Sequence, residues 1–191
     1  GAATLASIAK QIADGALTTD LDALNNRITV ANTFTSTIES TGASYNGAID
    51  IASAQAILGA VDSTAASVTT GNAAATAQAS PATYTVATSG NEVAEGDILT
   101  VTVTASKTLG TDTAFSFGLQ GDTLDGVVDA ATTADYTSTS SGQILILAGQ
   151  SSTSFDIDIA DDSTAEAIEG LNVVILDGDL NVVGEANAII L

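Results

Sequence analysis

The chain has 191 residues, of which 23 are acidic and only 3 are basic, so its formal net charge at pH 7 is −20. This charge excludes nucleic acids and anionic membrane surfaces as partners, because both are bound through basic protein surface. The sequence has no His and no Cys, and only 4% of its residues are aromatic. The common nucleophile–base pairs of enzymes and a sugar-stacking cleft are therefore missing, and we expect no catalytic activity.

The composition also bears on where the protein is located. No stretch approaches the roughly 18 consecutive apolar residues of a membrane-spanning helix, so we expect no membrane insertion. The sequence contains no Met, and we expect Gly1 to be a processed start. Small and β-branched residues dominate, as in many exported surface proteins, and the lack of Cys is compatible with secretion without disulfide formation. We therefore expect a secreted protein.

Apolar residues recur every three or four positions in the first 80 residues, most regularly from Leu21 to Ile38, which is the pattern of amphipathic helices. We predict that residues 1–68 form a helical domain with three short helices. Three short helices in about 70 residues bury only a thin core, so packing against a neighbouring subunit would help to stabilise this domain. The segment 69–81 is rich in Ala, Thr and Gln, and we predict that it is a linker. The pattern predicts helices over residues 5–13, 21–38 and 51–61, the last capped by Asp50.

In the second part of the chain, residues 82–191, apolar and polar residues alternate with a period of two, which indicates half-buried strands. Six or seven short strands separated by turn signals predict an antiparallel, immunoglobulin-like β-sandwich. The expected fold class is α+β with separate domains, a small helical domain followed by this sandwich. Strands are predicted over residues 84–87, 99–105, 115–119, 144–147, 155–159, 171–176 and 186–191.

The segment from Asp161 to Glu169 is the most informative part of the chain, because it places four carboxylates within nine residues. No Lys or Arg lies nearby, and unit charges about 4 Å apart repel by about 1 kcal/mol even in water. Such a cluster requires either full solvation or a counter-ion. Calcium is the natural counter-ion, because it takes several hard oxygen ligands in flexible geometry. A calcium site and a solvated acidic loop both remain open interpretations.

Four motifs in order make residues from about 84 to 191 resemble a Calx-beta domain. They are Glu-Gly-Asp at 95–97, Asp-Tyr at 135–136, Leu-Ala-Gly-Gln at 147–150 and the acidic run at 161–169. The resemblance implies a seven-stranded sandwich that can bind calcium at one end. Carried over residue by residue, the implied calcium ligands are Glu95, Asp135, Asp161, Asp162, Glu166 and Glu169.

The sequence departs from the family in one respect, because calcium-binding members usually have an acidic run after the last strand, where this chain has Ile189, Ile190 and Leu191. A neighbouring subunit could supply the missing carboxylates, for example from Asp14, Asp20 and Asp22. The first half of the chain resembles, through residues 26–35 and 54–58, a helical module of secreted repeats-in-toxin-like and S-layer-like bacterial proteins. That resemblance implies an extracellular or cell-surface location in a bacterium.

These observations lead us to expect a structural subunit of a calcium-stabilised extracellular assembly, either a filament or a surface layer. Its partners would be calcium ions and other copies of itself, joined through a sheet edge or terminal strand and through helical faces. An alternative is an adhesive binding module of a larger surface protein, which calcium makes rigid. A spacer domain without any ligand is a third possibility.

Overall fold

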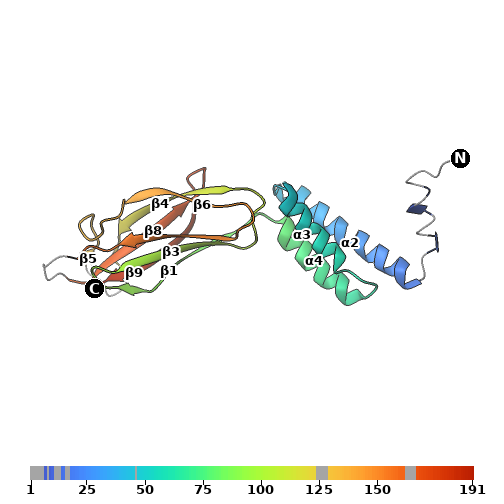
Figure 1. Cartoon of the computed structure of the whole chain (residues 1–191), viewed down its shortest axis with the longest axis horizontal. Coiled ribbons are helices and arrows are strands. Elements are labelled where there is room, and N and C mark those ends of the chain that lie inside the picture. Colours follow the sequence, from blue (N-terminus) through green and yellow to red (C-terminus); the bar gives the residue numbers. More distant parts are fainter. Residues whose placement is uncertain are drawn as a thin grey trace. The chain divides into compact units, whose positions relative to one another are not determined.

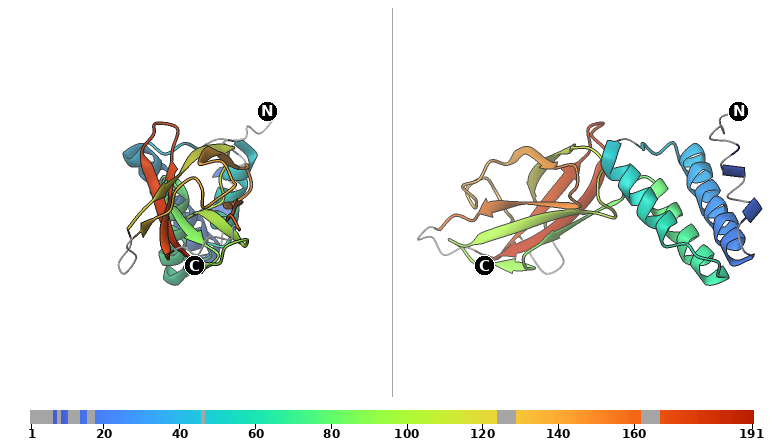
Figure 2. Two further views of the ribbon diagram at one scale, coloured as in Figure 1. Left: turned by 90° about the vertical axis from the view of Figure 1, so that its left-hand side faces the viewer. Right: turned by 45° about the vertical axis from the view of Figure 1, so that its right-hand side comes forward.

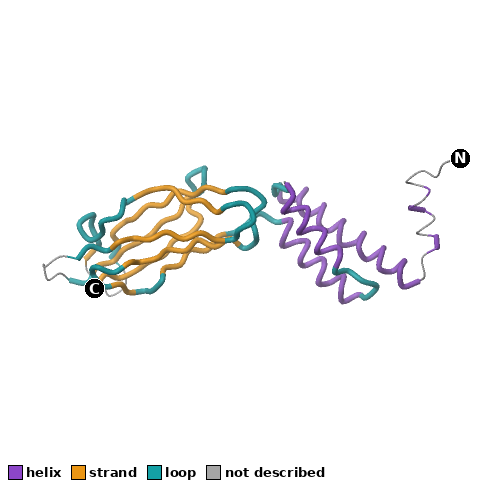
Figure 3. Tube along the Cα trace, in the orientation of Figure 1, coloured by secondary structure: helices purple, strands orange, loops and turns teal. Residues whose placement is uncertain are grey.

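The computed structural model describes residues 7, 9–10, 14–15, 18–45, 47–123, 129–161 and 167–191. The chain forms two compact units, Gly1–Pro81 and Ala82–Leu191. The described helices all lie in the first unit and the described strands all lie in the second (Figure 3). The predicted fold class, a helical domain followed by a β-sandwich, is therefore confirmed. None of the helices in the described part of the chain is long and apolar enough to cross a membrane.

The helical unit is built around two parallel helices with a third running the opposite way (Figure 1). At one end of the parallel pair, the Asn26 side chain donates a hydrogen bond to the carbonyl of Thr64. At the other end, the Thr41 hydroxyl donates to the carbonyl of Ala79. The helices are α2 (Thr18–Thr41), α3 (Gly47–Gly59) and α4 (Ala65–Ala79), of which α2 and α4 are the parallel pair.

The core of this unit is thin, as the sequence predicts. Its fully buried side chains are those of Val30, Val61 and Ala75. A close approach between α2 and α4 depends on Gly71, because a Cβ atom at this position would lie 2.9 Å from a methyl carbon of Val30. The unit is therefore stabilised by small-residue packing rather than by a large apolar core.

The segment 69–81, predicted to be a linker, is instead mostly helical and belongs to α4, which ends at Ala79. Its composition allows this because Gly71, Ala75 and Ala79 recur every four residues and are buried against the rest of the unit. The helix begins at a regular N-cap, in which the Thr64 hydroxyl accepts a hydrogen bond from a backbone N–H one turn later. The Ala- and Thr-rich composition therefore marked a packed helix.

The two other helix predictions have different outcomes. Asp50, predicted to cap the third helix, lies inside the first turn of α3, because that helix already begins at Gly47. Its side chain is only 7% exposed and lies within hydrogen-bond distance of the Gln78 amide. Asp50 therefore joins α3 to α4. The helix predicted over residues 5–13 lies largely outside the described residues.

The β unit consists of two facing sheets whose strands run along its long direction (Figures 1 and 2). The first sheet has the order β1-β3-β7, and the second has the order β2-β9-β8-β4-β6 with β5 paired to β8. All pairings are antiparallel except the two short ones, β2 with β9 and β5 with β8. The strands are β1 (Tyr84–Thr88), β2 (Glu92–Val93), β3 (Ile98–Ala105), β4 (Thr113–Gly121), β5 (Asp129–Ala130), β6 (Ser141–Ile146), β7 (Ser152–Asp158), β8 (Glu169–Leu176) and β9 (Val182–Ile190).

The core of the sandwich lies between the sheets and follows the period of two in the sequence. On β3 the inward residues are fully buried, and the intervening Thr side chains face outward. The seven predicted strands correspond to the seven longer strands of the structure. The sequence missed β2 and β5, because two residues are too few to show a period. The largest fully buried side chains of this unit are those of Leu99, Val101, Val103, Ile146, Ile157, Leu171, Val173 and Ile175.

Two glycines on β4 provide a test of this packing. A Cβ atom at Gly121 would lie 2.0 Å from the backbone oxygen of Ala131, whereas a Cβ atom at Gly118 would meet nothing within 4 Å. We therefore expect Gly121→Ala to lower the free energy of unfolding of the β unit by about 2 kcal/mol or more, because backbone must shift to relieve the clash. Gly118→Ala should leave it within about 1 kcal/mol of wild type or raise it.

Urea unfolding followed by near-ultraviolet circular dichroism measures both variants against the wild type. The two substitutions are chemically identical and lie on the same strand, so strand propensity cannot separate them. Equal stability of Gly121→Ala and Gly118→Ala would contradict the close approach of β4 to Ala131.

Candidate functional site

Four of the six predicted calcium ligands lie in the described part of the chain, and all four belong to one end of the sandwich. Glu95 precedes the start of β3, Asp161 follows the end of β7, and Glu169 begins β8. The pairing of Ile98 with Asp158 places the start of β3 beside the end of β7. The other two predicted ligands, Asp162 and Glu166, lie outside the described residues.

Backbone hydrogen bonds tie the carboxylate-bearing loops at this end to one another. The N–H of Gly96 donates to the carbonyl of Ala160 at 3.2 Å, and the N–H of Ile159 donates to the carbonyl of Asp97 at 3.0 Å. The N–H of Ala160 in turn donates to the carbonyl of Asp135 at 3.0 Å. The loop before β3, the loop around Asp135 and the segment after β7 therefore form one connected structure.

Gly96 brings the first loop against the carboxylate of Asp161. Its φ of +77° lies in the left-handed region, which favours Gly. A Cβ atom at this position would lie 3.1 Å from the Cβ atom of Asp161 and 3.6 Å from its carboxylate oxygen Oδ2. The Glu-Gly-Asp motif therefore forms a turn that leaves room for the side chain of Asp161. Glu95, the first residue of the motif, is half-buried.

Asp135 is the most buried carboxylate of this end, with 9% of its surface exposed. Its Oδ2 atom accepts hydrogen bonds from the backbone N–H of Thr132 and from the Thr132 hydroxyl, the latter at 2.9 Å. Burial alone would raise the pKa of Asp135, but the hydrogen bonds from Thr132 and from the side chain of Glu169 outweigh it and lower the pKa below its usual value. Asp135 is therefore held as a carboxylate.

The side chain of Glu169 contributes to the lowered pKa of Asp135, so these two acidic side chains lie close together. Ionised carboxylates that lie close together repel each other. A cation bound at the same place would balance both negative charges. This pair is therefore the point at which the chemistry of the site would respond to a metal ion.

The donor set at this end fits a hard cation by chemical type. It offers carboxylate and carbonyl oxygens and no nitrogen or sulfur ligand, which suits calcium and not zinc. Among the described residues, no group of three acidic side chains is close enough to hold a metal ion. The described candidate ligands therefore match calcium in chemical type but do not by themselves form a coordination shell.

Some acidic residues at this end are not among the predicted ligands, and two of them are Asp97 and Asp129. Asp97 belongs to the Glu-Gly-Asp motif, and its carbonyl accepts the hydrogen bond from Ile159, so the motif itself could have indicated it. Asp129 lies on β5, directly paired with Glu169 of β8. Because this parallel pairing joins strands of different lengths far apart in the sequence, no pattern in the sequence indicates it.

Comparison with known proteins gives a likeness in fold. No protein-family model and no curated protein sequence matches the chain. The crystal structure of CBD12 from CALX1.2 matches at 18% identity over 56% of this chain and 44% of that one, with a TM-score of 0.43. The calcium binding domain CBD12 of CALX1.1 matches at 16% identity over the same shares, with a TM-score of 0.42.

A third structure, the apo-form Calx CBD1 domain, matches at 15% identity over 57% of this chain and 96% of that domain, with a TM-score of 0.42. The chain therefore spans less than half the length of the first two structures and nearly all of the third. Enzymes are also among the matched structures, so the likeness does not bear on catalysis. What the comparisons give is structural similarity to Calx-beta domains over a little more than half of this chain.

Proposed function

We propose that the β unit is a calcium-binding module and that its site is the end of the sandwich where the carboxylate-bearing loops converge. One observation carries the proposal: backbone hydrogen bonds hold the loops of Glu95, Asp135 and Asp161 together although each loop brings negative charge. The residues that would hold the ion are these three and Glu169, together with ligands from the rest of the acidic run. Bound calcium would supply the positive charge that the chain itself lacks there.

The electrostatics of the chain support this proposal. Residues 81–191 contain 17 acidic residues and 1 basic residue, a net charge of −16, whereas residues 1–80 have 6 and 2, a net charge of −4. Repulsion among the loop carboxylates opposes the compact state of the β unit, and a divalent ion relieves it. Calcium present at about 100 times its dissociation constant would add about 2.7 kcal/mol to the free energy of unfolding.

The proposal extends to a structural role outside the cell, as a subunit of a calcium-stabilised filament or surface layer. Exposed apolar side chains at both ends of the sandwich support contacts between copies. Leu180 and Val182 are 72% and 56% exposed beside the turn between β8 and β9, and Ile98 and Leu191 are 55% and 53% exposed at the acidic end. An ion at the acidic end would allow a second, equally acidic copy to approach.

The first test concerns calcium binding itself. We expect calcium to raise the melting temperature of the β unit by roughly 10 °C at about 100 times its dissociation constant, because it binds the folded loops only. Asp161→Asn should weaken binding at least about tenfold, because it removes one of the anionic ligands. Isothermal titration calorimetry and scanning calorimetry measure both effects.

The matched control is Asp179→Asn, which removes the same charge from the turn between β8 and β9, at the other end of the sandwich. It should bind calcium as the wild type does. The proposed site would be contradicted if calcium bound neither the wild type nor Asp179→Asn at millimolar concentration. It would also be contradicted if Asp161→Asn and Asp179→Asn bound calcium equally well.

The second test separates the structural role of Asp135 from metal binding. The lowered pKa means that ionised Asp135 stabilises the fold above its unfolded pKa of about 3.9, and this stabilisation is lost as the pH falls through the lower folded pKa. In EDTA at pH 7 we expect Asp135→Asn to lower the free energy of unfolding by about 1–3 kcal/mol, because it disturbs the charged hydrogen bonds from Thr132.

Urea unfolding between pH 7 and pH 2 measures this difference. It should shrink as the pH falls below about 4, because protonated Asp135 then resembles Asn in charge. A difference that does not change with pH would show that the charge of Asp135 does not contribute to stability.

The third test concerns assembly. We expect the chain to form polymers or sheets in calcium and to dissociate in EDTA, as measured by light scattering and electron microscopy. Val182→Asp should shift the onset of assembly to higher protein concentration, because it places charge in an exposed apolar contact. A chain that stays monomeric at high concentration in calcium would rule out the structural subunit and support the alternative, a calcium-rigidified binding module of a larger surface protein.

A further inference from the structure

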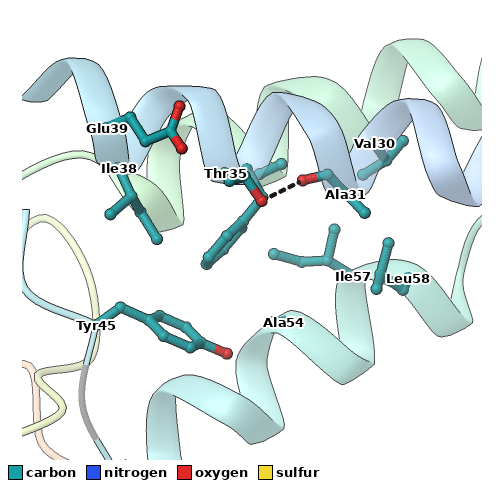
Figure 4. A pocket seen from close by; sticks show the side chains of 11 residues that line it. Val30, Ala31, Thr35, Ile38, Glu39, Tyr45, Ala54, Ile57 and Leu58 are labelled. Atoms are coloured by element: carbon teal, nitrogen blue, oxygen red, sulfur yellow. Dashed lines mark hydrogen bonds between the residues drawn. The ribbon is translucent and has the colours of Figure 1, made fainter.

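A second candidate site lies in the helical unit, as an apolar cavity of about 290 Å³ between α2 and α3 (Figure 4). The side chains of Phe34 and Ile38 line it from α2, and those of Ile57 and Leu58 line it from α3. Sites for small molecules have volumes of about 300–1,000 Å³, so this cavity is at the lower end of that range. It has room for one small organic molecule.

The cavity reaches down to the core of the helical unit. Val30 of α2 and Ala75 of α4 are fully buried, belong to this core and also line the cavity. Because the core has few buried side chains, apolar contacts made in the cavity would add appreciably to it. A molecule bound there would therefore stabilise the helical unit against unfolding.

Two aromatic rings line the cavity. Phe34 and Tyr45, which lies in the loop before α3, pack edge to face, with 5.1 Å between the ring centroids and 79° between the ring planes. A third ring can join such a pair, since aromatic rings attract one another in edge-to-face and offset arrangements. The face of an aromatic ring also attracts a cation within about 6 Å of its centroid. The pair therefore suits a ligand that carries both a ring and a positive charge.

The charge at the cavity is negative. Among the described residues that line it, Glu39 is the only charged one, and this residue is exposed, so it marks the rim (Figure 4). Burial and the nearby charge of Asp50 both raise the pKa of Tyr45, so a second carboxylate acts on the cavity from α3. The described lining is therefore complementary to positive charge.

We propose that this cavity binds a small organic cation with an apolar, aromatic body. The body would lie between α2 and α3 against Phe34 and Tyr45. The charged group would lie at the rim beside Glu39, where it remains in contact with water. This proposal does not depend on the proposed calcium site, which lies in the other unit.

A second copy of the chain suits the cavity less well than such a cation does. The side chain of Leu180 is 72% exposed, but the turn that carries it also carries Asp177 and Asp179. If Leu180 of a second copy entered the cavity, these carboxylates would approach Glu39 and repel it. Repulsion of the same kind disfavours an anionic ligand.

Ligands of similar shape and different charge test the proposal. Phenethylamine is a cation at pH 7, phenethyl alcohol is neutral and hydrocinnamic acid is an anion, and each carries one phenyl ring on a short chain. We expect the amine to bind the full chain about two- to fivefold more tightly than the alcohol, as an exposed charge pair would allow, and the acid to bind most weakly. Isothermal titration calorimetry in EDTA gives the dissociation constants without any contribution from calcium.

Three variants locate the binding. Glu39→Gln should remove the advantage of the amine and leave the affinity for the alcohol unchanged. Ala54→Leu places a larger side chain in the cavity and should weaken the binding of the amine and the alcohol at least about tenfold. Ala56→Leu is the matched control, because Ala56 lies on α3 outside the described lining, and it should bind both ligands as the wild type does. Far-ultraviolet circular dichroism checks that the helices of each variant are folded.

The proposal would be overturned if the amine failed to bind at millimolar concentration, or if the amine and the alcohol bound equally well. An amine affinity that Glu39→Gln leaves unchanged, or that Ala54→Leu and Ala56→Leu share, would overturn it as well. Light scattering of the ligand-free proteins tests the other occupant. Self-association of the wild type that Ala54→Leu abolishes would assign the cavity to a second copy instead.

Discussion

Backbone hydrogen bonds that join the carboxylate-bearing loops at one end of the β-sandwich are the constraint on which the proposed function of the β unit depends. The loops that carry Glu95, Asp135 and Asp161 are joined by backbone hydrogen bonds, so they cannot separate to relieve the repulsion without losing those bonds. With no Lys or Arg among them, the charges must be balanced by protons, by solvent or by an added cation. The calcium site proposed above would supply such a cation.

The hydrogen bonds to Asp135 stabilise these loops without such a cation. Burial alone would raise the pKa of Asp135, but the backbone N–H and the hydroxyl of Thr132 donate hydrogen bonds to its carboxylate and lower the pKa. Groups of its own loop therefore solvate this buried charge. The loop would keep its shape whether or not a cation is bound.

The sequence was informative where a periodic pattern governs the structure. The period of two on β3, from Leu99 to Ala105, is also the burial pattern of that strand, so strands and core could be predicted together. It is misleading where one composition suits two structures, because the Ala- and Thr-rich segment 69–81 has the composition of a linker but forms most of α4. Two-residue strands and the pairing of Asp129 with Glu169 arise only in the folded chain, so neither could be predicted.

For the candidate site too, the sequence predicted the residues, whereas their arrangement appears only in the folded chain. Motifs indicated which acidic residues lie in the loops at this end, because a motif records which residue types occupy a loop, and calcium binding by these residues stays a prediction. The arrangement of the loops depends on contacts between distant segments, such as the turn at Gly96 that leaves room for Asp161. The motif Glu-Gly-Asp therefore has two physical roles, supplying a carboxylate through Glu95 and the left-handed turn through Gly96. A side chain at Gly96 would press on Asp161 and strain the turn, so the glycine is as necessary to the geometry of the site as the carboxylates are to its charge.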